Sequence, residues 1–253
     1  MYFRACWFNR RYRLIAYLAL TLCLAVVASL PAGLERYQDH WTVIRIISQE
    51  GLALVWNTAV SNTLAAMLVA LVFIAADLGA LGLGDDPEQR CMDFLLSRPR
   101  SRAHLVWTSW LAGLTQLLPL LVLPLLTSLG VLAGLTHALL PGNLFRLSVP
   151  LFAMAAAMYT LAFFMATATA SARQGYELAA LAAVLFLGYR VILGAEGEIV
   201  IWRPDSVWIW LHGAYDWYLS PHQVFPSANL LLVAAAILFL PYLAQLSFVR
   251  RDL

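Results

Sequence analysis

Long apolar runs separated by short polar segments constrain this chain more than any other feature. A helix that crosses roughly 30 Å of hydrocarbon needs about 20 apolar residues. Six stretches meet or approach that length: 14–30, 52–76, 105–126, 149–170, 176–193 and 230–248. With 62% hydrophobic and 12% charged residues, a chain of 253 residues has too much apolar surface for one water-soluble core. The sequence therefore predicts an all-α integral membrane protein with six transmembrane helices in a single domain, residues 1–253.

The first apolar run follows a basic segment and so resembles a signal peptide. The run 14–30 has 17 residues, whereas the apolar core of a signal peptide has about 7–15. The sequence from Ala28 to Pro31 is also a poor cleavage site. We therefore expect a signal anchor that is retained as the first span.

One region is longer than a single span requires. From Ala103 to Leu140 the chain is apolar for nearly 40 residues, about twice the length of one span. Two arrangements fit this length. The region is either a hairpin of two short helices that turns near Pro119 or Pro124, or one span followed by an interfacial segment over 127–140.

The arginine distribution favours six spans over seven. The chain has no lysine, so its 16 arginines carry all the side-chain positive charge. With six spans and both ends in the cytoplasm, 11 arginines lie on the inner side and 5 on the outer side, as the positive-inside rule requires. A seventh span would place Arg250 and Arg251 opposite the basic N-terminus. The sequence predicts a multi-pass protein of the inner (plasma) membrane with both termini cytoplasmic, and leaves open whether 127–140 is spanning or interfacial.

The outer loop at 194–228 is long, acidic and rich in tryptophan. Tryptophan collects at the membrane–water boundary, where one polar edge of an apolar ring is best solvated. We expect residues 206–219 to form an interfacial or re-entrant helix between spans five and six. Its anchors are Trp208, Trp210 and Trp217. The alternative is an aromatic patch that grips a substrate.

The loop between spans two and three, residues 82–102, carries a short amphipathic helix. Asp85 or Asp86 as the cap, followed by Pro87 and Glu88, gives a good helix-start signal, and Pro99 ends the helix. Apolar positions spaced i, i+3 and i+4 form one stripe, made of Met92, Leu95 and Leu96. Such a helix either rests on lipid headgroups or docks into a groove of a protein partner. Anionic lipid would repel its acidic residues, which favours a protein partner.

This loop resembles the coupling region of the type-2 ABC transporter permease family. Members often read Glu-x-Gly-Thr-Leu-Glu-x-Leu-Leu and then Ser-Arg-Pro-Val-Ser-Arg before the third span. The positions that match or conservatively replace this pattern are Glu88, Met92, Asp93, Leu95, Leu96, Ser97, Arg98, Pro99, Ser101 and Arg102. Arg90 and Cys91 stand where Gly-Thr is usual, and Arg100 where Val is usual. The ending 248–253 also resembles a common ending in these permeases.

The resemblance implies two permease copies, as a homodimer or a related heterodimer, bound to two separate ATPase subunits. The Gly-x-x-x-x-Gly-Lys-Ser/Thr phosphate loop needs a lysine, which this chain lacks. ATP and Mg²⁺ would therefore be held by the partner ATPase, and this chain would be a non-catalytic permease, most often an exporter in this family. The implied ATPase-coupling residues are Asp86, Glu88, Arg90, Met92, Asp93, Leu95, Leu96, Ser97, Arg98, Pro99 and Arg102.

Polar groups inside a membrane are candidates for function. Asn57, Asn62 and Gln116 lie within predicted spans, whereas Asp77 and Glu177 lie near span ends. We take these five as candidate residues of a substrate path. The alternatives are hydrogen bonds between helices for these amides, as also expected for Gln245 in the last span, and snorkelling to water for the carboxylates.

Other function classes have weak support. The three cysteines and five histidines show no metal-ligand or disulfide spacing, so no metal is expected, and no basic stripe with exposed aromatics suggests nucleic acid. No nucleophile–base pair can be picked out, so no catalytic residue is assigned. The runner-up is a membrane enzyme or non-ABC scaffold with an outer-face site in 196–222. Its groups would come from Asp205, His212, Asp216 and His222.

Overall fold

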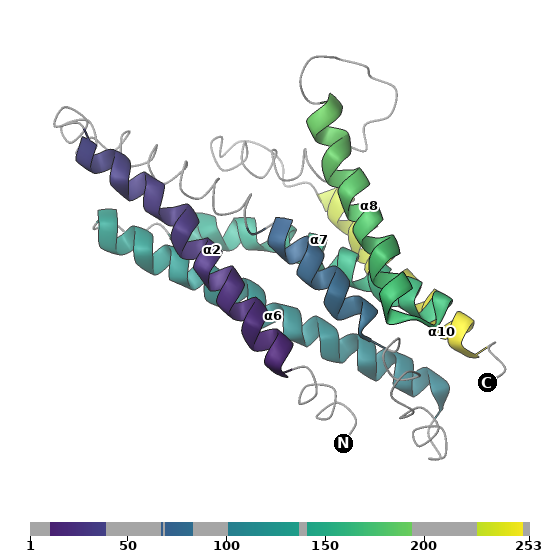
Figure 1. Cartoon of the computed structure of the whole chain (residues 1–253). Helices are drawn as coiled ribbons and strands as arrows, with labels where there is room; N and C mark the ends of the chain where they lie inside the picture. Colours follow the sequence, from purple (N-terminus) through teal and green to yellow (C-terminus); the bar gives the residue numbers. More distant parts are fainter. Residues whose placement is uncertain are drawn as a thin grey trace.

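The computed structural model describes residues 11–38, 67, 69–82, 101–136, 141–193 and 227–249. Within these ranges the regular structure is helical throughout and contains no strand. The helices are α2 (Arg11–Gln38), Val69–Ala80, α6 (Arg102–Thr136), α7 (Pro141–Thr169), α8 (Ala172–Leu193) and α10 (Ser227–Val249) (Figure 1). The predicted all-α fold is confirmed for this part of the chain.

Two helical stretches are long and apolar enough to cross a membrane. They are Arg102–Val131 in α6 and Leu151–Thr169 in α7, while the apolar stretches Val69–Ala80 and Val233–Val249 are shorter. Large apolar side chains on the outside of the bundle are exposed, as expected of a surface that contacts lipid. Examples are Leu118, Leu126, Leu185 and Phe239. Six spans remain a prediction.

Helix α6 excludes one of the two arrangements for the region 103–140, which the structure describes up to residue 136. It is one helix of 35 residues that contains both Pro119 and Pro124, so the hairpin alternative is wrong. Residues 127–136 continue the same helix. At 1.5 Å per residue its length is about 52 Å, well beyond the roughly 30 Å of hydrocarbon. Prolines are tolerated in such a helix because neighbouring groups and local adjustments satisfy the freed backbone carbonyls.

The helices share one end of the bundle, which we call the Arg102 end (Figure 1). Contacts between helix starts and helix ends define it. The start of α2 meets the end of Val69–Ala80, the start of α6 meets the end of α10, and the start of α8 meets the end of α7. The contacting pairs are Arg13 with Asp77, Trp107 with Gln245, and Gly175 with Ala166.

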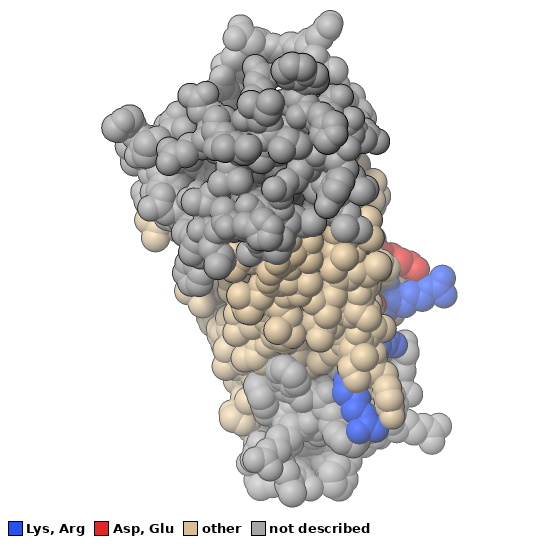
Figure 2. Space-filling model, turned by 90° about the vertical axis from the view of Figure 1, so that its left-hand side faces the viewer, with Lys and Arg blue, Asp and Glu red and all other residues tan. Residues whose placement is uncertain are grey.

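The charged side chains that the structure describes, six in number, lie at the Arg102 end. Every charged residue whose side chain the structure describes lies in the first two turns of α2, α6 or α8, or in the last turn of Val69–Ala80. These residues are Arg11, Arg13, Asp77, Arg102, Arg173 and Glu177. Figure 2 shows a broad uncharged surface, with basic and acidic side chains along one side of it. An uncharged belt beside a charged layer is the pattern expected of a membrane-embedded surface.

Small residues let the helix Val69–Ala80 and α6 approach α7 closely. Gly79 lies against the backbone carbonyl of Tyr159, and Gly113 of α6 lies against the Tyr159 hydroxyl. Tyr159 and Phe163 are fully buried and stack with ring centroids 6.2 Å apart. Since little hydrophobic force drives helices together in lipid, such close contacts between small and large residues contribute much of the packing energy. Helix α7 is therefore the centre of the described bundle.

Candidate functional site

Hydrogen bonds fix the first part of α6 to its neighbours at the Arg102 end. The indole Nε1 of Trp107 donates to Oε1 of Gln245 in α10 at 2.8 Å, and Nε1 of Trp110 donates to Oγ1 of Thr160 in α7 at 3.2 Å. The hydroxyl of Tyr159 donates to the backbone carbonyl of Trp110, at an oxygen–oxygen distance of 3.1 Å. We call these five residues the α6 clamp.

Two features of the structure allow the hydroxyl groups of Tyr159 and Thr160 to take part in the clamp. Gly113 leaves room for the Tyr159 hydroxyl, which a side chain there would displace. Thr160 donates its own hydroxyl to the carbonyl of Ala156 at 2.7 Å, which leaves its oxygen lone pairs free for Trp110. Pairing matters here because an unpaired polar group in an apolar core costs about 1–3 kcal/mol.

Asp77, a candidate substrate-path residue, is paired with the first helix. The hydroxyl of Tyr17 in α2 donates to Oδ2 of Asp77, and Nη1 of Arg13 lies 3.7 Å from the same oxygen. The Asp77 side chain is 25% exposed, against 54% for Arg13. The carboxylate therefore joins α2 to the helix Val69–Ala80 and is not simply extended into water.

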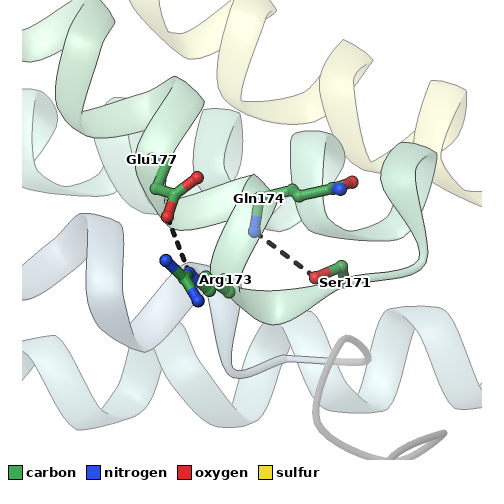
Figure 3. Close-up of polar contacts among 4 residues, drawn as sticks. All are labelled: Ser171, Arg173, Gln174 and Glu177. Carbon is green, nitrogen blue, oxygen red and sulfur yellow. Dashed lines mark hydrogen bonds and ion pairs between the residues drawn. The ribbon is translucent and has the colours of Figure 1, made fainter.

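Glu177, a second candidate, lies on the surface at the start of α8. Its Oε1 accepts a hydrogen bond from Nε of Arg173 at 2.8 Å, and both side chains are largely exposed (Figure 3). This hydrogen bond raises the pKa of Arg173 above its ordinary value. In the same turn, Oγ of Ser171 accepts from the backbone N–H of Gln174 at 3.4 Å and caps α8. The structure gives Glu177 a local role at the helix start.

Gln116, the third described candidate, is different. Its side chain is fully buried in α6, and neither Oε1 nor Nε2 has a hydrogen-bond partner in the described part of the chain. The hydroxyls of Ser109 and Ser128, on the same helix, are also buried without a partner there. Hydrogen bonding between helices thus accounts for Gln245 but not for Gln116.

The three candidates do not converge on one site. Asp77 contacts α2, Glu177 contacts its own helix, and Gln116 has no polar contact among the described residues. Within the described ranges, no three His, Cys, Asp or Glu side chains lie close enough to hold a metal ion. Some predicted residues lie outside those ranges, namely Asn57, Asn62, the coupling residues Asp86–Pro99, and Trp208, Trp210 and Trp217.

Both ends of the predicted coupling loop join helices that pack on α7. Gly82, after Val69–Ala80, lies against the ring of Phe163. On the other side Ser101 caps α6, because its Oγ accepts from the N–H of His104 at 3.3 Å. The loop therefore begins and ends on helices that share one neighbour.

Sequence reasoning missed the α6 clamp. Trp107, Trp110 and Tyr159 read as apolar span residues, although each carries one polar atom that needs a partner when buried. The signal in the sequence was the presence of three aromatic residues with one polar atom each, together with two polar residues within the predicted spans, Thr160 and Gln245.

Comparison of the chain with protein-family models and with curated proteins finds no match. Its function is therefore inferred from its own residues and their arrangement.

Proposed function

We propose that this chain is the permease subunit of an ATP-driven transporter of the type-2 ABC class, working as an exporter. In this proposal it spans the inner membrane six times with both termini in the cytoplasm. Two permease copies, identical or related, assemble with two ATPase subunits that hold ATP and Mg²⁺. The basis is the resemblance of residues 82–102 to the coupling region of that family, together with the structure on either side of the loop.

The observation that carries the proposal is the attachment of the loop. A coupling loop works as a lever only if its ends join a stiff body, since a flexible joint would absorb the displacement. Here the helix before the loop contacts α7 through Gly79 and Gly82, and the helix after it is fixed to α7 and α10 by the α6 clamp. A push on the loop would move these helices as one block.

The position of the charges supports the proposed orientation. The six charged residues whose side chains the structure describes lie at the Arg102 end, where the loop is attached. If that end faces the cytoplasm, the loop faces the compartment that holds ATP. The acidic residues of the loop, which anionic lipid repels, would then meet a protein surface.

Co-expression with the cognate ATPase tests the proposal. The purified chain alone should hydrolyse no ATP, and the pair should copurify as a two-plus-two complex with ATPase activity. Glu88→Lys should impair assembly or coupling, since a reversed charge at a docking interface can cost several kcal/mol. Leu95→Asp should do the same by placing a carboxylate in an apolar groove.

The matched control is Glu198→Lys, the same charge reversal in the predicted outer loop. It should keep the complex yield and ATPase rate of the unmodified chain. The docking proposal fails if Glu88→Lys and Leu95→Asp both behave like this control. Loss of function only in Glu198→Lys would instead favour an outer-face site in 196–222.

A further inference from the structure

Gln116 is in an unfavourable position in the described conformation. Its amide can donate two hydrogen bonds and accept two, yet it is fully buried in an apolar core and makes none within the described residues. Buried polar groups are nearly always paired, so an unpaired one calls for a physical reason. One such reason is that the residue has its partner in another conformation.

The hydrogen bonds of α6 divide the helix on either side of this residue. The hydrogen bonds that the structure describes from α6 to α7 and α10 involve Trp107, Ser109 and Trp110. From Leu114 to Val131, the side-chain hydrogen bonds that the structure describes stay within α6, from Thr115 to Ala112 and from Thr127 to Leu123. Among the described residues, polar contacts thus fix the first part of α6 to its neighbours, whereas the contacts of the second part with other helices are apolar.

Two prolines lie at the start of the second part. Proline has no backbone N–H, so Pro119 and Pro124 cannot donate to the carbonyls of Thr115 and Leu120. Each missing bond removes a local restraint, which is why prolines are common sites of bending in long helices. Gln116 lies one turn before Pro119, between the fixed part of the helix and these weak points.

We propose that α6 bends at Pro119 and Pro124 into a second conformation in which water reaches Gln116 and hydrogen-bonds its amide. The bend separates the second part of α6 from the bundle core, and the α6 clamp stays closed. This inference rests on the proposed transport function and deepens it, because it places a hydrated position on the transport path. The described structure is then the closed conformation, with Gln116 unpaired.

Thermal unfolding of the purified chain in detergent tests the energetic part. Gln116→Met keeps the shape of the side chain and removes an unpaired buried amide, so it should raise the melting temperature by about 2–4 °C. Gln245→Met is the matched control. It makes the same change at an amide that Trp107 pairs, and it should lower the melting temperature. A fall in both variants would overturn the proposal, because it would mean that Gln116 is paired in the dominant conformation.

Cysteine accessibility tests the opening itself. In a chain with Cys6, Cys23 and Cys91 changed to Ser, Gln116→Cys should react with N-ethylmaleimide at least about tenfold faster than Ala112→Cys. Ala112 is the matched position, since it is also fully buried in α6 and lies one turn earlier, beside the clamp. Adding Pro119→Ala and Pro124→Ala should slow the reaction at position 116, because the complete backbone bonds resist bending.

Equal rates at positions 112 and 116, or a rate at position 116 that the proline changes leave as it was, would overturn the proposed bend. Both experiments use the chain without an ATPase. Failure of the docking proposal would therefore leave these results unchanged, and failure here would leave the docking proposal unchanged.

Discussion

The indole Nε1 of Trp107 donates to the amide Oε1 of Gln245 at 2.8 Å, across 138 residues of sequence. The bond joins the first turns of α6 to the last turns of α10 at the Arg102 end. Trp107 also meets Trp110 edge to face, with ring centroids 5.4 Å apart, so its ring is held on two sides. The helix that leaves the predicted coupling loop is thus connected to the last described helix.

A double-mutant cycle on this pair measures the connection. Trp107→Phe removes the N–H and keeps an aromatic ring, and Gln245→Met removes the acceptor and keeps the chain length. We expect each single change to destabilise the protein, and a coupling energy of about 0.6 kcal/mol and at most about 1.7 kcal/mol, the average and the maximum for hydrogen bonds between membrane helices. Unfolding by denaturant in detergent gives the four free energies. Strictly additive effects would mean that the bond contributes nothing.

The contacts of Asp77 predict unequal roles for its two partners. Tyr17→Phe removes a hydrogen bond to a carboxylate, and such bonds contribute about 1.5–3 kcal/mol. Arg13→Gln removes an ion pair at 3.7 Å from a half-exposed side chain, which contributes about 0–1 kcal/mol. The free energy of unfolding should therefore fall more in Tyr17→Phe. The reverse order would show that charge, and not the hydroxyl, holds α2 to the helix Val69–Ala80.

Two glycines predict opposite responses to the same substitution. A Cβ at Gly79 would collide with the backbone carbonyl of Tyr159, which cannot move without shifting α7, so Gly79→Ala should cost about 1–3 kcal/mol. At Gly130 nothing lies within 4 Å of the added atom. Gly130→Ala should therefore be neutral or stabilising by up to about 1 kcal/mol, since alanine favours helix. The melting temperature should therefore fall in Gly79→Ala and stay the same or rise in Gly130→Ala. Equal melting temperatures would contradict the close contact of the helix Val69–Ala80 with α7.

Hydropathy was sufficient to locate helices but not to settle their lengths. The long apolar runs predicted helices near 14–30, 105–126, 149–170, 176–193 and 230–248, and a helix lies at each. The prolines at 119 and 124 suggested a turn, yet α6 continues through both. Proline lowers helix stability locally, and neighbouring helices can restore it. That compensation comes from tertiary contacts, so a local pattern cannot reveal it.

The sequence showed which polar residues lie in or near the spans, but not which residues they hydrogen-bond. Gln116 and Gln245 look equivalent in the sequence, but one is buried without a partner among the described residues and the other accepts from Trp107. Asp77 looked like a carboxylate near a span end, and its pairing with Tyr17 links residues 60 positions apart. Which helices lie side by side decides these partners, and that information is absent from any single span.

The tryptophans of the outer loop give a prediction that separates two interpretations. If Trp208, Trp210 and Trp217 anchor an interfacial helix, changing all three to Ala should lower the yield of folded protein or dimer, because the segment loses its attachment to the boundary. Gel filtration in detergent measures both quantities. Normal folding and assembly with loss of transport alone would instead support an aromatic patch that contacts the cargo.

The location of the charged side chains predicts the topology. A reporter that is active only in the cytoplasm should be active when fused after Leu253, and silent when fused within 196–216. The reason is electrostatic, since 11 of the 16 arginines lie on one side of a six-span arrangement and basic loops are retained in the cytoplasm. The described charged side chains, which gather at the Arg102 end, should lie on that side too.

A chain with Arg98, Arg100 and Arg102 changed to Gln provides the control for this prediction. It has lost three inner charges, so the split becomes eight to five and the bias weakens. A mixed reporter signal from this variant, beside a uniform one from the unmodified chain, would identify arginine as the determinant. An outer C-terminus in the unmodified chain would contradict the six-span arrangement with both termini in the cytoplasm.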